Sequence, residues 1–244
     1  MGIVYLAIMT KQAPDPSDLS HVLDDPARHA LLGPHAEFAE RVGDVLRYPP
    51  EMSFFTSLPP RPTEADWRDA AKLLGPGGIL TAASDAVPDR PGWEVVMALP
   101  GVQLVDDGIA AASDPEAVRL TAADVPEMTA LVEHAKPGPF RSRTIEMGTY
   151  LGIRQEGRLV AMAGTRLHPP GHAEISAVCT HADFRGRGLA ARLVLAVAHD
   201  IRSRGEIPFL HAAADNTAAI RLYEALGFRL RRTVVFGGIR VPAE

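Results

Sequence analysis

Apolar and polar positions in the first half of the chain predict an α/β arrangement. The apolar residues between positions 34 and 48 recur with the spacing of one helix face. A second helix is predicted over residues 63–74, where Thr63 and Asp66 form a capping-box pattern and Gly75 a stop. Strands are predicted at short apolar runs separated by Pro and Gly turns, namely 52–58, 78–82, 93–99 and 102–105.

The second half alternates between strand and helix patterns more regularly. Asp124 and Pro126 mark the start of one helix, and Glu156-Gly157 the turn of a hairpin. Helices are further predicted from Leu189 to Gly205 and over 216–226. The predicted strands are 118–121, 150–154, 159–167, 173–180, 209–214 and 232–236.

The strand at 173–180 leads into a glycine-rich turn, so the faces of its side chains matter. A period of two predicts two sets of residues on opposite faces. One set is His172, Glu174, Ser176, Val178 and Thr180; the other is Ile175, Ala177 and Cys179.

Composition describes a globular protein, and the length allows one large domain or two small ones, of which we expect two. The chain has 244 residues, of which 46% are hydrophobic and 23% charged. Small and polar residues at 108–115 mark a boundary, which predicts one domain at 1–115 and a second at 116–244.

The distribution of charge favours an anionic small ligand over a nucleic acid. A net charge of −5 argues against a nucleic-acid partner. From residue 181 onward, however, ten arginines face six acids, giving +4 and leaving −9 for the rest. We therefore expect the C-terminal half to bind an anion.

A single cysteine, Cys179, excludes an intramolecular disulfide and a multi-cysteine zinc site. A reducing, cytoplasmic location is expected. The apolar leader at residues 1–9 is too short for a membrane span or a signal peptide, so no membrane association is expected. No metal site is proposed, because the histidines are scattered and no H-E-x-x-H pattern occurs.

The turn F-R-G-R-G-L-A, at residues 184–190, joins a predicted strand to a predicted helix. Backbone N–H groups and the helix dipole point at such a position, which suits phosphate. Gly186 and Gly188 allow close approach of the backbone, and Arg185 and Arg187 add charge. The same turn also fits the dinucleotide fingerprint G-x-G-x-x-A, although the expected acid is missing at the usual spacing. A Walker loop is excluded, because no Gly-Lys pair occurs.

Two motifs together resemble one family. Arg185-x-x-Gly188-x-Ala190 resembles the R/Q-x-x-G-x-G/A signature of GCN5-related N-acetyltransferases (GNAT), and A-A-I-R-L-Y-E-A-L-G-F, at 218–228, resembles their closing motif. The segment E-I-S-A-V-C-T-H-A-D-F-R-G-R-G-L-A, with A-A-D-N at 213–216, is similar to the FR47-like branch. The resemblance covers residues 118–236, about half of the chain.

The resemblance implies a GNAT fold for 116–244, with a mixed, mostly antiparallel sheet flanked by helices. The role of residues 1–115 is left open between a degenerate copy of the same fold, a substrate wall and the surface of a homodimer. The segments at 136–149 and 168–172 are expected to shape the acceptor pocket.

The resemblance also assigns roles to residues. Turn amides of Arg185, Gly186, Arg187, Gly188, Leu189 and Ala190 would hold the pyrophosphate of acetyl-coenzyme A. Backbone groups of Val178, Cys179 and Thr180 would bind the pantetheine arm and steady the thioester carbonyl. Asn216 would bind the arm as well, and Tyr223, two helical turns further on, would protonate the departing thiolate.

The reaction expected is transfer of an acetyl group to an amine by direct attack, on a small molecule or on an amino-terminal or side-chain amine. Glu174 is the favoured general base and His172 the alternative on the same strand face. Cys179 is not expected to act as a nucleophile. Two other readings are kept open: a coenzyme-A-binding regulatory module without turnover, and an NAD(P)-binding enzyme.

Overall fold

The computed structural model describes residues 21–243, and the leader at residues 1–9 lies outside them. Within the described residues, the strands form one large sheet in the order β4-β11-β5-β10-β9-β8-β7-β6 and one small sheet in the order β1-β2-β3. The large-sheet strands are β4 (Ile79–Ser84), β5 (Glu94–Asp106), β6 (Ala117–Arg119), β7 (Tyr150–Gln155), β8 (Arg158–Thr165), β9 (His172–Thr180), β10 (Ile207–Ala213) and β11 (Phe228–Arg240).

The small sheet contains β1 (Glu40–Val42), β2 (Val45–Arg47) and β3 (Thr56–Ser57). The α-helices are α1 (Pro26–Leu31), α2 (Glu64–Leu74), α3 (Val125–Ala135), α4 (Leu189–Ser203) and α5 (Thr217–Ala225). In the part of the chain that the structure covers, each helix lacks the length or the apolar character of a membrane span.

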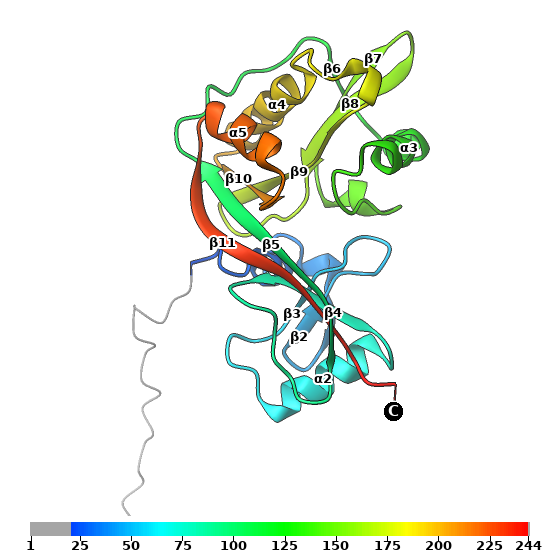
Figure 1. Ribbon diagram of the computed structural model, residues 1–244, viewed down its shortest axis with the longest axis vertical. Helices are drawn as coiled ribbons and strands as arrows, with labels where there is room; N and C mark the ends of the chain where they lie inside the picture. Colours follow the sequence, from blue (N-terminus) through cyan, green and yellow to red (C-terminus); the bar gives the residue numbers. More distant parts are fainter. Residues whose placement is uncertain (1–20, 244) are drawn as a thin grey trace, which may run out of the picture.

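Two long strands, β5 and β11, connect the two halves of the chain. They pair antiparallel from Phe228 opposite Asp106 to Arg240 opposite Glu94. Figure 1 shows them passing from the group around α4 and α5 to the group around α2 and the small sheet. Because β5 precedes residue 115 and yet lies between β10 and β11, the sheet continues across the division expected between 115 and 116.

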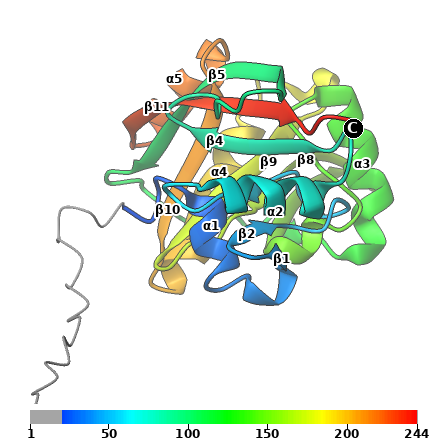
Figure 2. The ribbon, with the colours of Figure 1, turned by 90° about the horizontal axis from the view of Figure 1, so that it is seen from below.

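The faces of the large sheet bury separate apolar clusters. One cluster packs α4 and α5 on β5, β8, β9 and β10, through residues such as Leu104, Ile175, Val197 and Leu210. Phe209, next to Leu210 on β10, instead belongs to a cluster with α1 and the small sheet. A third cluster packs α3 on β7, β8 and β9, and a fourth packs α2 on β4 and β11. Figure 2 shows α2 beside β4, with α1 and β1–β2 close by.

Several predicted elements are confirmed. Helix α2 begins at Thr63 with the capping box to Asp66 and is followed by Gly75. The hairpin of β7 and β8 turns at Glu156 and Gly157, whose φ angles are 51° and 82°, as a two-residue loop of this type requires. The strands and helices predicted at 173–226 also correspond to β9, α4, β10 and α5.

The helix predicted over residues 34–48 is wrong, because the chain forms a hairpin there. β1 and β2 pair with Val42 opposite Val45, and Gly43 adopts a φ of +57° between them. Apolar residues spaced for one helix face also fit two short strands when a glycine permits the reversal. Two further differences concern length: 93–99 and 102–105 form the single strand β5, and the strand predicted at 232–236 extends over β11.

A bulge in β9 corrects the predicted alternation of its faces. Ser176 pairs with Gly164 and Cys179 with Met162, so two residues of β9 oppose one residue of β8. Ala177, inside the bulge, has a φ of 54°. Val178 consequently packs in the α4 cluster together with Ile175, whereas Cys179 and Ala177 pack in the α3 cluster. One extra residue reverses the faces of everything that follows it.

The contribution of β5 to the core can be measured. Leu104 is fully buried in the α4 cluster, so Leu104→Ala should lower the free energy of unfolding by about 2–5 kcal/mol. The control on the same strand is Val95→Ala, at a side chain that is 57% exposed, with an expected change of about 0.5 kcal/mol or less. Urea unfolding measures both, and equal losses would show that β5 is not a core strand in solution.

A buried histidine predicts a pH dependence of stability. His35 Nδ1 is hydrogen-bonded to Tyr48 Oη at 2.9 Å, and His35 Nε2 is hydrogen-bonded to His168 Nδ1 at 3.2 Å. Burial, with the nearby His168, lowers the pKa of His35 to about 4. The unfolded chain therefore takes up a proton near pH 6.5, which the folded chain does not. Stability should be complete above pH 6.5 and fall by about 3 kcal/mol as the pH approaches 4.

The measurement compares urea unfolding between pH 7 and 4 for wild type and His35→Gln. The free energy of unfolding of the variant should change less between pH 7 and 4 than that of wild type. The control His199→Gln changes an exposed histidine of α4 and should leave the slope as in wild type. The same slope in His35→Gln as in wild type would contradict the assignment.

Candidate active site

The parallel strands β9 and β10 separate at their carboxyl ends. They pair from His172 opposite Ile207 to Ile175 opposite Leu210. Beyond this point β10 continues on β5, as far as Ala213 opposite Gly101, and β9 continues on β8, as far as Thr180 opposite Ala161. The bulge at Ala177 lies where the strands part. One edge of β9, including Val178, Cys179 and Thr180, therefore faces the gap between the strands and not a neighbouring strand.

Both helices that follow these strands begin at this same end of the sheet. β9 leads through a short 3-10 turn, η5 (Ala182–Phe184), to α4, and β10 leads to α5. Gly186 and Gly188 adopt φ values of 74°, and Gly188 is the N-cap of α4. Within residues 21–243, and apart from the adjacent residues of the chain, no heavy atom lies within 4 Å of a Cβ built on either glycine. The amide of Arg185, expected to hold phosphate, instead donates to the Ala182 carbonyl at 3.2 Å. The amides from Gly186 to Ala190 belong to the turn and the first residues of α4, at the positive end of the helix dipole.

The turn carries positive charge that no carboxylate of residues 21–243 neutralises. Arg185 donates to the Thr180 carbonyl at 3.4 Å, and Arg187 donates to the Asp183 carbonyl at 3.2 Å and covers the Phe184 ring. Arg192, one turn further along α4, is by contrast paired with Asp114 and Glu116. Charges that remain unpaired at a helix N-terminus suit an anionic ligand.

Thr180, at the end of β9, has a buried hydroxyl without a hydrogen-bond partner among the described residues. A buried hydroxyl without a partner costs stability unless a ligand or a water molecule satisfies it. Its position beside Arg185 makes the space between β9 and α4 the natural place for that ligand.

Asn216 is the N-cap of α5 and Tyr223 lies within this helix, which follows β10 on the other side of the gap. The Oδ1 atom of Asn216 caps α5 by accepting from the amide of Ala219 at 3.2 Å, which leaves the exposed NH₂ group as a donor. Tyr223 is 8% exposed, with its ring against Phe228. Burial and the nearby Cys179 raise the pKa of Tyr223 to about 12, so the phenol keeps its proton at neutral pH.

Cys179 is a buried thiol in the cluster of α3. Burial raises its pKa to about 12. Because only the thiolate is strongly nucleophilic, a thiol with this pKa is unreactive at neutral pH.

Glu174 lies near the start of β9, several residues before Val178, Cys179 and Thr180, and belongs to a buried ion cluster. Its carboxylate accepts two hydrogen bonds from Arg166, at 2.9 and 2.7 Å, and lies 2.8 Å from His211 Nδ1. Burial alone would raise the pKa of Glu174, but the charge of Arg166 and the hydrogen bonds of His211 and Arg166 outweigh it and hold the pKa far below its usual range. A carboxylate in this state accepts a proton poorly. His172, at the start of β9, lies against His21 and Phe209.

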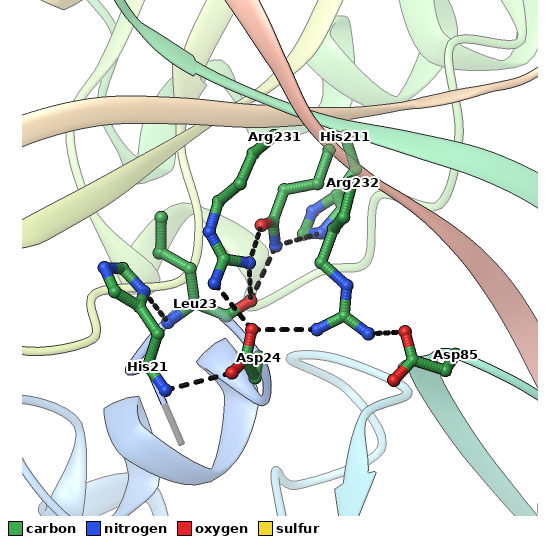
Figure 3. Close-up of polar contacts among 8 residues, drawn as sticks. His21, Leu23, Asp24, Asp85, His211, Arg231 and Arg232 are labelled. Carbon is green, nitrogen blue, oxygen red and sulfur yellow. Dashed lines mark hydrogen bonds and ion pairs between the residues drawn. The ribbon is translucent and has the colours of Figure 1, made fainter. Parts of the chain in front are cut away.

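The ion cluster continues into the first half of the chain. Gln103 Nε2 donates to the Leu23 carbonyl at 2.8 Å and lies 3.0 Å from His211 Nε2, so His211 accepts at Nε2 and donates at Nδ1 to Glu174. Figure 3 shows Arg231 and Arg232 converging on Asp24, at 2.6 and 2.9 Å, with Asp85 beyond. The segment before α1 is thereby fixed to the sheet beneath Glu174.

Arg166 and His211 were not identified from the sequence. Arg166 and His211 each lie within a predicted strand, 159–167 and 209–214, and only the pairing of β8, β9 and β10 brings both to Glu174. Among residues 21–243, no group of three or more His, Cys, Asp or Glu side chains is placed to hold a metal ion.

Comparison with known proteins gives the same family as the motifs. Residues 150–236 match the model of the family FR47-like protein. A GNAT-family protein of known structure from Novosphingobium aromaticivorans is 40% identical, with 90% of this chain and 98% of that chain covered and a TM-score of 0.82. A GCN5-related N-acetyltransferase from Kribbella flavida, 18% identical with a TM-score of 0.63, shares the fold over 89% of this chain and 95% of its own.

Curated relatives are similar over shorter regions. Mycothiol acetyltransferase from Rhodococcus opacus is 30% identical over 140 residues, which is 50% of this chain and 44% of that protein. The same enzyme from Saccharopolyspora erythraea is 35% identical over 92 residues, or 37% of this chain and 30% of that protein. The match thus spans less than half the length of these relatives. Through the full-length likeness to the Novosphingobium protein, this chain belongs to the GNAT family, and its residues 150–236 are similar to the FR47-like model.

Proposed function

We propose that this protein transfers an acetyl group from acetyl-coenzyme A to an amine by direct attack in a ternary complex. The separation of β9 from β10 carries the proposal, because it leaves one edge of β9 open beside two helix N-termini. Arg185 and Arg187, which lie there, have no carboxylate partner among residues 21–243. Acetyl-coenzyme A matches this arrangement with an extended amide-bearing arm and a pyrophosphate. The GNAT relatives support an acyltransferase.

The residues take the following roles in the proposal. Amides from Gly186 to Ala190 bind the pyrophosphate, with the side chains of Arg185 and Arg187 adding charge. Backbone groups of Val178, Cys179 and Thr180 bind the arm and orient the thioester, and the Thr180 hydroxyl gains a partner. The NH₂ group of Asn216 donates to the arm from the opposite side.

Tyr223 supplies the proton that the reaction needs. As the amine nitrogen forms a bond to the thioester carbonyl carbon, the carbon–sulfur bond breaks and the electron pair stays on sulfur. The phenol, protonated at neutral pH, gives its proton to this thiolate. The nitrogen gives up a proton to a base, a role for which Glu174 stays a prediction. The acceptor, the length of the acyl chain, a homodimer and a cytoplasmic location also remain predictions.

Replacement of the phenol should separate chemistry from binding. Tyr223→Phe removes the proton donor and keeps the ring against Phe228, so kcat should fall about 10²-fold or more, with the affinity for acetyl-coenzyme A unchanged. The measurements are release of free thiol across an amine panel and the rise in Tm with acetyl-coenzyme A. Equal rates in the two proteins would remove Tyr223 from this role. Stabilisation by NADH alone would point to a nicotinamide enzyme, and binding without turnover to a regulatory module.

Substitution of Glu174 should mainly lower stability, because Glu174 forms a buried ion pair with Arg166. Glu174→Gln leaves the Arg166 charge buried without a full counter-charge and should lower the free energy of unfolding by about 3–5 kcal/mol. The carboxylate's contribution is complete above pH 4.3 or so, the pKa of the unfolded chain, and is lost only as the pH falls toward its lowered pKa.

A double variant separates stability from catalysis at this position. Glu174→Leu with Arg166→Met removes both charges together and should recover more than half of the lost stability. Urea unfolding measures the recovery. If the folded double variant still releases thiol, Glu174 is not the base; if it binds acetyl-coenzyme A as wild type does but no longer releases thiol, the predicted role is supported.

A further inference from the structure

A concave site lies outside the residues assigned to the cofactor. It is a cavity of about 340 Å³ between a loop of the first half and the loop that follows α3. Its lining residues are Pro50, Glu51, Phe54, Pro139, Phe140, Arg141 and Ser142. The volume is in the range of pockets for small molecules, about 300–1,000 Å³.

The two lining loops are fixed to each other by hydrogen bonds. The amide of Arg143 donates to the Glu51 carbonyl at 2.9 Å, and the buried hydroxyl of Thr144 donates to the Met52 carbonyl at 2.7 Å. The Thr144 hydroxyl also accepts from the amide of Arg141 at 2.8 Å. The cavity is therefore formed before a ligand arrives, which lowers the entropic cost of binding.

Arg141 is the distinctive group of this cavity. Its guanidinium lies 3.7 Å from the centroid of the Phe54 ring, and its Nε atom is buried without a hydrogen-bond partner. No carboxylate within residues 21–243 forms an ion pair with it, whereas Arg143 nearby makes two hydrogen bonds to Glu146. Stacking on Phe54 holds the planar group in place and leaves its N–H edge for a planar anion, which a carboxylate matches with two hydrogen bonds.

The cavity is connected to the end of β9 through one apolar cluster. Phe140 lines the cavity and also packs in the cluster that contains Tyr150, Ala177 and Cys179. Its ring centroid is 5.6 Å from that of Tyr150. Phe140, from the cavity wall, and Ala177, from the bulge of β9, thus pack against the same apolar cluster.

We propose that this cavity binds the acceptor, and that the acceptor is a small amine carrying a carboxylate, of the amino acid or short peptide class. Arg141 holds the carboxylate, Phe54 and Phe140 form the apolar walls, and Glu51 attracts the ammonium group as the acceptor enters. Opposite charges on the two loops match the two charges of a zwitterion. The proposal rests on the acetyl transfer proposed above, for which it names the substrate class.

Turnover tests the preference for a carboxylate. Glycine, L-leucine and L-phenylalanine are each compared with their carboxamides, by release of free thiol from acetyl-coenzyme A. For each protein we take the ratio of kcat/KM for the acid to kcat/KM for its amide. Comparing this ratio between wild type and a variant cancels the differing reactivities of the two amines. The ratio should be at least tenfold lower in Arg141→Gln than in wild type and less strongly lowered in Arg141→Lys, which keeps the charge without the planar fork. Arg143→Gln is the control on the same loop and should match wild type.

Binding tests the same point without turnover. N-acetylglycine, N-acetyl-L-leucine and N-acetyl-L-phenylalanine, the products of these acceptors, should include at least one that raises the Tm by about 2 °C or more at saturation. The corresponding amides should not, and Arg141→Gln should abolish the rise while keeping the rise with acetyl-coenzyme A.

The outcomes separate the two proposals. Equal shifts with acids and amides, no shift with any acid, or an unchanged ratio in Arg141→Gln would overturn the carboxylate site. Acid binding that depends on Arg141, with no thiol release from any acceptor, would support the site and count against acetyl transfer.

Discussion

The site depends on the separation of two parallel strands. β9 and β10 share four paired positions and then turn to different neighbours, β8 and β5. Strands that part in this way expose backbone groups that are normally paired within a sheet, and such groups need partners. The bulge at Ala177 lies at this place and puts a residue with a side chain at positive φ, which is energetically unfavourable. Bulges of this kind are common next to active sites, where they redirect side chains.

On the face of the sheet opposite α4, an almost completely buried cluster of polar and charged side chains joins the sheet to the first half of the chain. Arg166, Glu174 and His211 lie beneath the first half of the chain, and Gln103, Arg231 and Asp24 extend the network to the segment before α1. A buried ion pair contributes little net stability against an apolar pair of the same size, but removing one member is costly. The cluster therefore fixes how the first half sits on the sheet, and with it the position of the loop that lines the cavity around Arg141.

The large sheet runs through both halves of the chain and joins them into one structure. β5 comes from the first half, yet Leu104 is buried under α4 and α5, and β11 crosses from the α5 side to α2. The likeness to the Novosphingobium protein covers 90% of this chain, so it includes this arrangement and extends beyond the motifs of the second half. A cavity formed by both halves, with Glu51 and Phe54 from one and Arg141 from the other, follows from the same continuity.

The sequence by itself determined the local features. Capping residues predicted α2, a Glu-Gly pair predicted the hairpin of β7 and β8, and two motifs predicted the family, because each depends on neighbours within a few positions or on fixed spacing. Contacts between distant segments were decided by the tertiary structure. These include the strand order that inserts β5, the reversal of Val178 and Cys179 after the bulge, and the convergence of Arg166 and His211 on Glu174. Such features depend on strand register and on burial across the sheet, which local patterns of apolar residues do not specify.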